Sequence, residues 1–158
     1  MEILLTKNAS CGEHVLSCKR KDGSVTWTHV TSFFIMHDIC HYAVETVIPF
    51  RNAFFGMIKN GTDITEFELP KEQRNISLTS EALLAEHLAN LLVIEYTQGK
   101  MDNFLEILMA TYEADYNDET IRLITNEKLE RIRLIYSKLM EKWNILAEHA
   151  TMTLIFED

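Results

Sequence analysis

The feature that most constrains the fold is a stretch, residues 22–50, that contains no lysine or arginine. Residues 32–48 have helical spacing; Thr31 or Ser32 can cap this helix and Pro49 ends or kinks it. A surface helix normally carries a charged face, whereas a helix that is apolar nearly all round is buried. The sequence therefore predicts a buried helix over these residues.

Four polar side chains share one side of this predicted helix: His37, Asp38, His41 and Glu45. At about 100° per residue, all four fall within an arc of about 100°. Burying them without partners is costly, and a divalent cation offsets that cost because its ligands are neutral histidine and carboxylate. Histidines at i and i+4 also have the spacing by which one helix gives two ligands to zinc. We therefore predict a site for a divalent metal ion such as zinc, inside the protein or lining a cleft.

The same four residues take candidate roles in that site. His37 and His41 are the expected metal ligands. Glu45 or Asp38 is either a third ligand or the base that activates a water molecule on the metal. This assignment treats Asp38 and Glu45 as the candidate catalytic residues of a small metal-dependent hydrolase.

Two resemblances rest on this segment. Residues 36–41, Met-His-Asp-Ile-Cys-His, are similar to the metal-binding "LHDIGH" stretch of HD-type phosphohydrolases. That family completes its site with an upstream histidine and a downstream aspartate in an all-helical fold, whereas strands are expected upstream here and no downstream acid is an obvious match. The longer pattern His37-Asp38-x-x-His41-Tyr42-x-x-Glu45, followed by Asn-Ala-Phe-Phe-Gly at 52–56, resembles an uncharacterised bacterial protein family and implies no activity.

A second element should complete the coordination sphere, because one helix alone rarely fills it. Residues 79–96 have helical spacing, and no lysine or arginine occurs between Arg74 and Lys100. The polar side chains among the leucines of this helix are Glu81, Glu86, His87, Asn90 and Glu95. We take His87 as the fourth candidate metal ligand; the alternative is a hydrogen-bonded core histidine.

The remaining patterns predict an α+β fold in a single domain, 1–158: a small antiparallel sheet packed on about five helices. The sheet combines an N-terminal hairpin, whose turn contains Asp22-Gly23, with a C-terminal strand. The expected strands are 3–6, 13–19, 25–30 and 151–156. The other expected helices are 50–59, 101–113 and 125–146, and 62–77 is expected to be an irregular loop or lid.

Composition limits the partners and the compartment. The net charge is −9, from 24 acidic and 15 basic residues, and such a field repels nucleic acid. We expect no membrane-spanning segment, since no apolar run reaches the required length. Three cysteines and a start without export-signal features favour reduced thiols in the cytoplasm.

Two functional hypotheses remain open from the sequence. The first is the divalent-metal-binding domain with hydrolase chemistry. The second is a non-catalytic interaction or ligand-binding module, for a small molecule or a peptide, in which the polar cluster is a hydrogen-bonded structural network. A metal site should have a solvent-reachable position, whereas a structural network should be sealed and charge-balanced.

Overall fold

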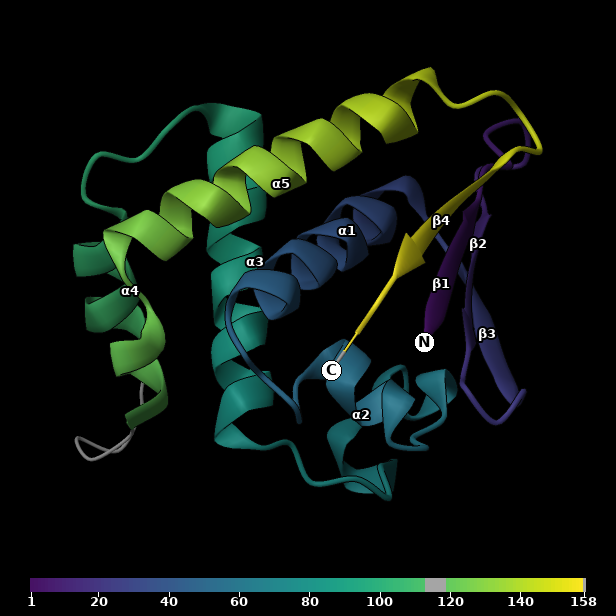
Figure 1. The fold of residues 1–158 in the computed structure, drawn as a ribbon, viewed down its shortest axis with the longest axis horizontal. Coiled ribbons are helices and arrows are strands. Elements are labelled where there is room, and N and C mark those ends of the chain that lie inside the picture. Colours follow the sequence, from purple (N-terminus) through teal and green to yellow (C-terminus); the bar gives the residue numbers. More distant parts are fainter. Residues whose placement is uncertain (113–118, 158) are drawn as a thin grey trace.

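In the computed structural model, which describes residues 1–112 and 119–157, a four-stranded antiparallel sheet packs against helices, and the predicted α+β class is confirmed (Figure 1). The strands are β1 (Glu2–Thr6), β2 (His14–Lys19), β3 (Val25–Val30) and β4 (Thr151–Ile155). The α-helices are α1 (Ser32–Val47), α2 (Phe54–Lys59), α3 (Ser80–Gln98), α4 (Phe104–Thr111) and α5 (Asn126–Ile145). Short 3-10 helices are η1 (Ile64–Phe67), η2 (Lys71–Gln73) and η3 (Glu119–Leu123).

The sheet has the strand order β3-β2-β1-β4: the C-terminal strand joins the N-terminal sheet as predicted, and it does so by pairing with β1. The hairpin between β2 and β3 turns at Gly23, whose φ of 87° is a conformation that glycine adopts without strain. Alternate side chains, such as those of Ile3 and Leu5 on β1, are buried against the helices. One face of the sheet is therefore part of the core.

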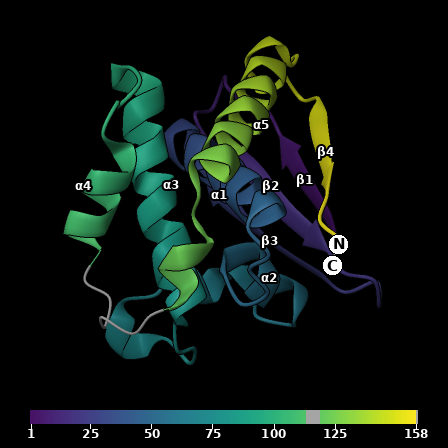
Figure 2. The same ribbon diagram turned by 60° about the vertical axis from the view of Figure 1, so that its left-hand side comes forward.

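Helix α1 lies in the middle of the molecule, and the prediction of a buried helix is confirmed. It packs against α3, α5 and α2 and against strands β2 and β3. Figure 1 shows it between the sheet and α3, with α5 crossing above it, and Figure 2 shows the same layers from another side. Ile35, Ile39, Ala43 and Val44 have no exposed surface. Because α1 is covered on several sides, the polar wedge formed by His37, Asp38, His41 and Glu45 must face another element or a cavity.

The second helix is shorter than expected: α2 begins at Phe54 rather than at residue 50. The preceding backbone turns instead, because the N–H groups of Arg51 and Asn52 donate to the Glu81 carboxylate at 2.9 and 2.6 Å. This contact ties the segment between α1 and α2 to the start of α3.

The fourth helix is also shorter than the expected range of 101–113. Asn103 has non-helical dihedral angles, so α4 begins at Phe104, and the predicted end at Glu113 lies outside the described residues. In the part of the chain that the structure describes, no helix combines the length and apolarity needed to cross a bilayer.

Candidate functional site

A cavity of about 650 Å³ lies between β3, α1, the segment from η1 to residue 78, and α3. Its lining is mostly apolar and includes three phenylalanines, Phe34, Phe54 and Phe67. The polar residues that line it are Thr28, His29, Thr31, His37, Asp38, His41, Glu68, Arg74 and Glu86. A largely apolar cavity with a few grouped polar side chains is the usual form of a small-molecule site.

The polar wedge of α1 divides into two parts. His37, Asp38 and His41 line the cavity, whereas Glu45 lies deeper and does not line it. All four residues are buried, with at most 8% of their surface exposed. The predicted burial of the four polar residues is thus confirmed, but only three of them can meet a molecule in the cavity.

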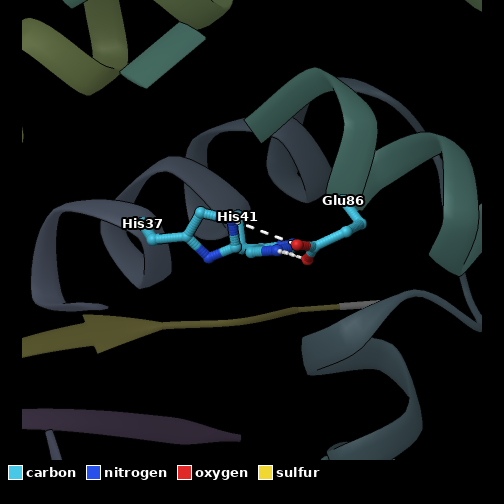
Figure 3. A group of neighbouring side chains, drawn as sticks. All are labelled: His37, His41 and Glu86. Atoms are coloured by element: carbon cyan, nitrogen blue, oxygen red, sulfur yellow. Dashed lines mark hydrogen bonds and ion pairs between the residues drawn. The ribbon is translucent and has the colours of Figure 1, made fainter. Parts of the chain in front are cut away.

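The residue that completes this group is Glu86 on α3. Its carboxylate reaches from α3 toward the two imidazole rings on α1 (Figure 3). Oε1 lies 3.5 Å from Nε2 of His37, and Oε2 lies 3.0 Å from Nε2 of His41. One ligand atom from each of the three residues falls within 4.8 Å of the others, a group that could hold a metal ion.

The spacing of these atoms suits a small divalent cation. Ligand atoms about 2.0–2.1 Å from a tetrahedral zinc ion lie about 3.3 Å from one another. The two distances from the Glu86 carboxylate to the imidazole nitrogens, 3.5 and 3.0 Å, bracket that value. The two carboxylate–imidazole contacts are therefore compatible with a small ion shared by the three side chains. Two histidines and one carboxylate are also the ligand set of open, catalytic metal sites.

Asn90 holds the Glu86 carboxylate from one helical turn further along α3. Its Nδ2 donates to Oε1 of Glu86 at 3.1 Å. The Glu86 side chain is otherwise 53% exposed and would have many rotamers available. The contact with Asn90 therefore orients the carboxylate toward the α1 histidines.

Glu45 is placed to support the site rather than to bind in it. Oε1 accepts a hydrogen bond from the N–H of Phe55 at 3.2 Å, and Oε2 accepts one from Gly56 at 3.1 Å. These N–H groups belong to the first turn of α2, where a carboxylate is stabilising. Oε1 also lies 3.5 Å from Nδ1 of His41. Since both oxygens are engaged with the backbone, the structure does not support the predicted roles of Glu45 as metal ligand or base.

Gly56 is the residue that lets α2 meet Glu45 in this way. A Cβ atom at position 56 would lie 2.4 Å from the carbonyl oxygen of Arg51, which is closer than real Cβ atoms approach. Only glycine permits this contact between the turn and the helix. The glycine in the 52–56 pattern therefore has a packing reason.

Asp38 is the unusual carboxylate of the cavity. It is buried, and no residue in the described ranges forms a hydrogen bond with it. Burial raises its pKa from 3.8 to about 7, and the nearby His41 opposes this shift only in part. Its carboxylate therefore has no described hydrogen-bond partner that would compete with a molecule in the cavity.

The charges of His41 and Glu86 stabilise each other. Burial alone would lower the pKa of His41, but the carboxylates of Glu45 and Glu86 outweigh it and raise the pKa to about 9. Burial alone would raise the pKa of Glu86, but hydrogen bonds and charge from His37 and His41 hold it well below its ordinary value. Without a metal, the pair is a charged hydrogen bond between α1 and α3.

His87, the predicted fourth ligand, lies outside this group. Its Nε2 is 2.6 Å from Oγ1 of Thr111 on α4, and its ring is tilted against Tyr112. The neighbouring residue, Glu86, occupies the position beside the α1 histidines. Glu86 is one of the polar side chains of the predicted helix, but the prediction assigned the ligand role to His87. The signal that favours Glu86 is Asn90 one turn later, an amide that can hold a carboxylate.

Comparisons with known proteins do not assign the chain to a family: no protein-family model, curated protein or solved structure matches it. A function is therefore inferred from the cavity and its side chains.

Proposed function

We propose that this chain binds a divalent metal ion, with zinc as the ion that the ligand set favours, through Nε2 of His37, Nε2 of His41 and the Glu86 carboxylate. We further propose that the bound ion makes the chain a small metal-dependent hydrolase. The observation that carries the proposal is the convergence of the three side chains, all of which line the cavity. The similarity of residues 36–41 to a metal-binding segment of phosphohydrolases points in the same direction.

The site has the open position that separates a catalytic metal centre from a structural one. Three protein ligands leave at least one coordination position free, whereas structural zinc sites are closed by four. The three side chains border a cavity of about 650 Å³, and the Glu86 side chain is half exposed. A sealed, charge-balanced network would have neither feature.

The residues around the ligands suit hydrolysis. A divalent ion at this position would lower the pKa of a bound water and polarise a carbonyl or phosphoryl oxygen. Asp38 borders the same cavity without a hydrogen-bond partner in the described ranges, so it can accept a proton there and return it to a leaving group. Glu45 faces Nδ1 of His41, the nitrogen away from Glu86, and would fix the orientation of that ring.

One observation favours the non-catalytic alternative. Nε2 of His41 and Oε2 of Glu86 are already 3.0 Å apart, so the two helices are joined without an ion. If no ion binds there, the cluster is a structural network and the cavity binds a ligand without catalysing a reaction.

Calorimetric titration of the metal-free protein with zinc distinguishes the two. We expect one site per chain, and Glu86→Gln should weaken it by more than about 100-fold, because removing a direct ligand costs more than removing a supporting partner. His87→Ala, one residue away on the same helix, is the matched control and should bind zinc as the parent does.

Equal binding by the parent and Glu86→Gln, or no saturable site in either protein, would contradict the metal proposal. The hydrolase proposal needs a second measurement, the release of 4-nitrophenol from simple ester and phosphoester substrates by the zinc-loaded protein. Turnover should be lost in Asp38→Asn while zinc binding is kept.

A further inference from the structure

We infer that the molecule held in the cavity is a small apolar or aromatic acid whose carboxylate or phosphate group pairs with Arg74. This inference names the substrate class for the proposed metal centre and rests on that proposal for its chemistry. The binding step itself depends on Arg74 and on the apolar walls, so it can be measured with or without a metal.

Arg74 is the only lysine or arginine among the described residues that line the cavity. Its guanidinium is held in place by the backbone of the preceding loop. Nε donates to the carbonyl of Leu69 at 2.7 Å, and Nη2 donates to the carbonyl of Phe67 at 3.0 Å. Two such bonds fix the plane of the group and reduce the entropy lost when it binds an anion.

The charge of Arg74 has no carboxylate opposite it in the described parts of the chain. No ion pair joins it to any acid there, and Nη1 donates to no described residue. This is unexpected in a protein with 24 acidic residues, in which the half-buried Arg133 pairs with both Glu95 and Glu130. A fixed, half-buried guanidinium without an acid partner is suited to an anionic group on a ligand.

The walls of the cavity specify the rest of the ligand. Phe54 and Phe67 pack edge to face with ring centroids 4.8 Å apart, and Phe34 lines the cavity as well. Such surfaces favour an aromatic or branched apolar body. His37 and His41, which line the same cavity, would meet the part of the molecule that reacts. The ligand is therefore an amphipathic acid, with an anionic group for Arg74 and an apolar body for the phenylalanine walls.

Three probes of one shape test this inference: 3-phenylpropionate, its neutral amide, and the cation 3-phenylpropylamine. Their dissociation constants are measured by titration with zinc-loaded and with EDTA-treated protein. We expect the acid to bind at least about tenfold more tightly than the amide or the amine in both preparations, since a charge-assisted bond to arginine is the difference.

The variant Arg74→Gln should remove this preference by bringing the acid to the affinity of the amide. Arg131→Gln, an exposed arginine of α5, is the matched control and should change nothing. A thermal melt of each variant shows that it is folded. The preference must persist in EDTA-treated protein, so this test can succeed even where zinc binding fails.

Two outcomes would overturn the inference. Equal binding of the acid and the amide would show that Arg74 does not recognise the anionic group, and tighter binding of the amine would show that Glu68, Asp38 and Glu86 set the charge preference instead. A preference for the acid that survives in Arg74→Gln and disappears with EDTA would show that the metal holds the carboxylate, which would support the metal centre and refute the role of Arg74.

Discussion

Asp38 should destabilise the fold at neutral pH, although its carboxylate is the group that the proposed hydrolase chemistry uses. Its pKa is raised to about 7 by burial, so the folded state holds this proton more tightly than the unfolded chain does. Ionisation of Asp38 therefore leaves stability unaffected below pH 4, lowers it progressively as the pH rises to 7, and lowers it by a constant amount above that.

The substitution Asp38→Asn should remove this destabilisation. In metal-free protein at pH 8 we expect its free energy of unfolding to exceed that of the parent by up to about 4 kcal/mol, whereas at pH 4.5 the excess should be only about 1 kcal/mol. Urea denaturation at the two pH values measures the difference. A gain that is the same at both values would mean that Asp38 is not the titrating group.

His41 makes the proposed metal binding depend on pH. Its pKa of about 9 means that it carries a proton at pH 7, and a metal ion must displace that proton to bind Nε2. The apparent association constant should rise about tenfold per pH unit from pH 7 toward 9 and then level off. Titration calorimetry in buffers of different ionisation enthalpy should show about one proton released per zinc at pH 7. An affinity that is flat from pH 7 to 8, with no proton released, would contradict this account.

The choice between Glu86 and His87 shows what single residues in the sequence do not reveal. Adjacent residues on a helix point about 100° apart, so the rotation of α3 about its axis decides which of them meets α1. That rotation is set by tertiary packing, including the contact of His87 with Thr111 on α4. The sequence locates the helix that completes the site and leaves two neighbouring candidates on it.

At the scale of the elements, Glu45 couples His41, a proposed metal ligand, to α2. One buried carboxylate contacts the first-turn N–H groups of α2 and faces Nδ1 of His41. We expect Glu45→Gln to lower the free energy of unfolding by about 2 kcal/mol and to weaken zinc binding by about 10–100-fold. Denaturation and calorimetry measure the two effects.

Glu81 provides the control for Glu45. It also accepts two backbone N–H groups, those of Arg51 and Asn52, but it lies nearer the surface and does not border the cavity. Glu81→Gln should therefore leave the zinc affinity unchanged. If both variants weakened zinc binding equally, a general loosening of the segment around α2 would explain the effect of Glu45 instead.

At position 56, the contact between α2 and the preceding turn should reverse the usual effect on stability of replacing a helical glycine by alanine. Replacing a helical glycine by alanine normally stabilises a protein by about 1 kcal/mol. Gly56→Ala should instead destabilise this one by about 1–3 kcal/mol, because the new methyl group would overlap the carbonyl oxygen of Arg51. An increase in the midpoint of urea denaturation would show that the turn yields without cost.

For the whole molecule, the fold class and the buried helix could be predicted because they depend on periodic patterns. The strand alternation, the Asp22-Gly23 turn and the apolar surround of α1 all act locally. The cavity could not be predicted in the same way, since it combines α1 with α3 and with an irregular segment that carries Arg74. In an irregular segment, no helical or strand pattern in the sequence indicates which side chains point toward the core.

The α2 boundary depends on a similar long-range contact. The sequence places a helix from residue 50, but the Arg51 and Asn52 backbone is held by Glu81, far along the chain. The wedge on α1 was thus predictable, and the partners that decide the role of each of its members were not.

The measurement that tests the central claim most directly is elemental analysis of untagged protein purified without chelator, beside Glu86→Gln prepared in parallel. The account predicts about one zinc, iron, manganese or nickel ion per chain in the parent and a large loss of that metal in the variant. An equal metal content in both proteins, or a parent that contains no metal and whose thermal melt is unchanged by added zinc, would contradict it. The latter result would leave His37, His41 and Glu86 as a structural link between α1 and α3.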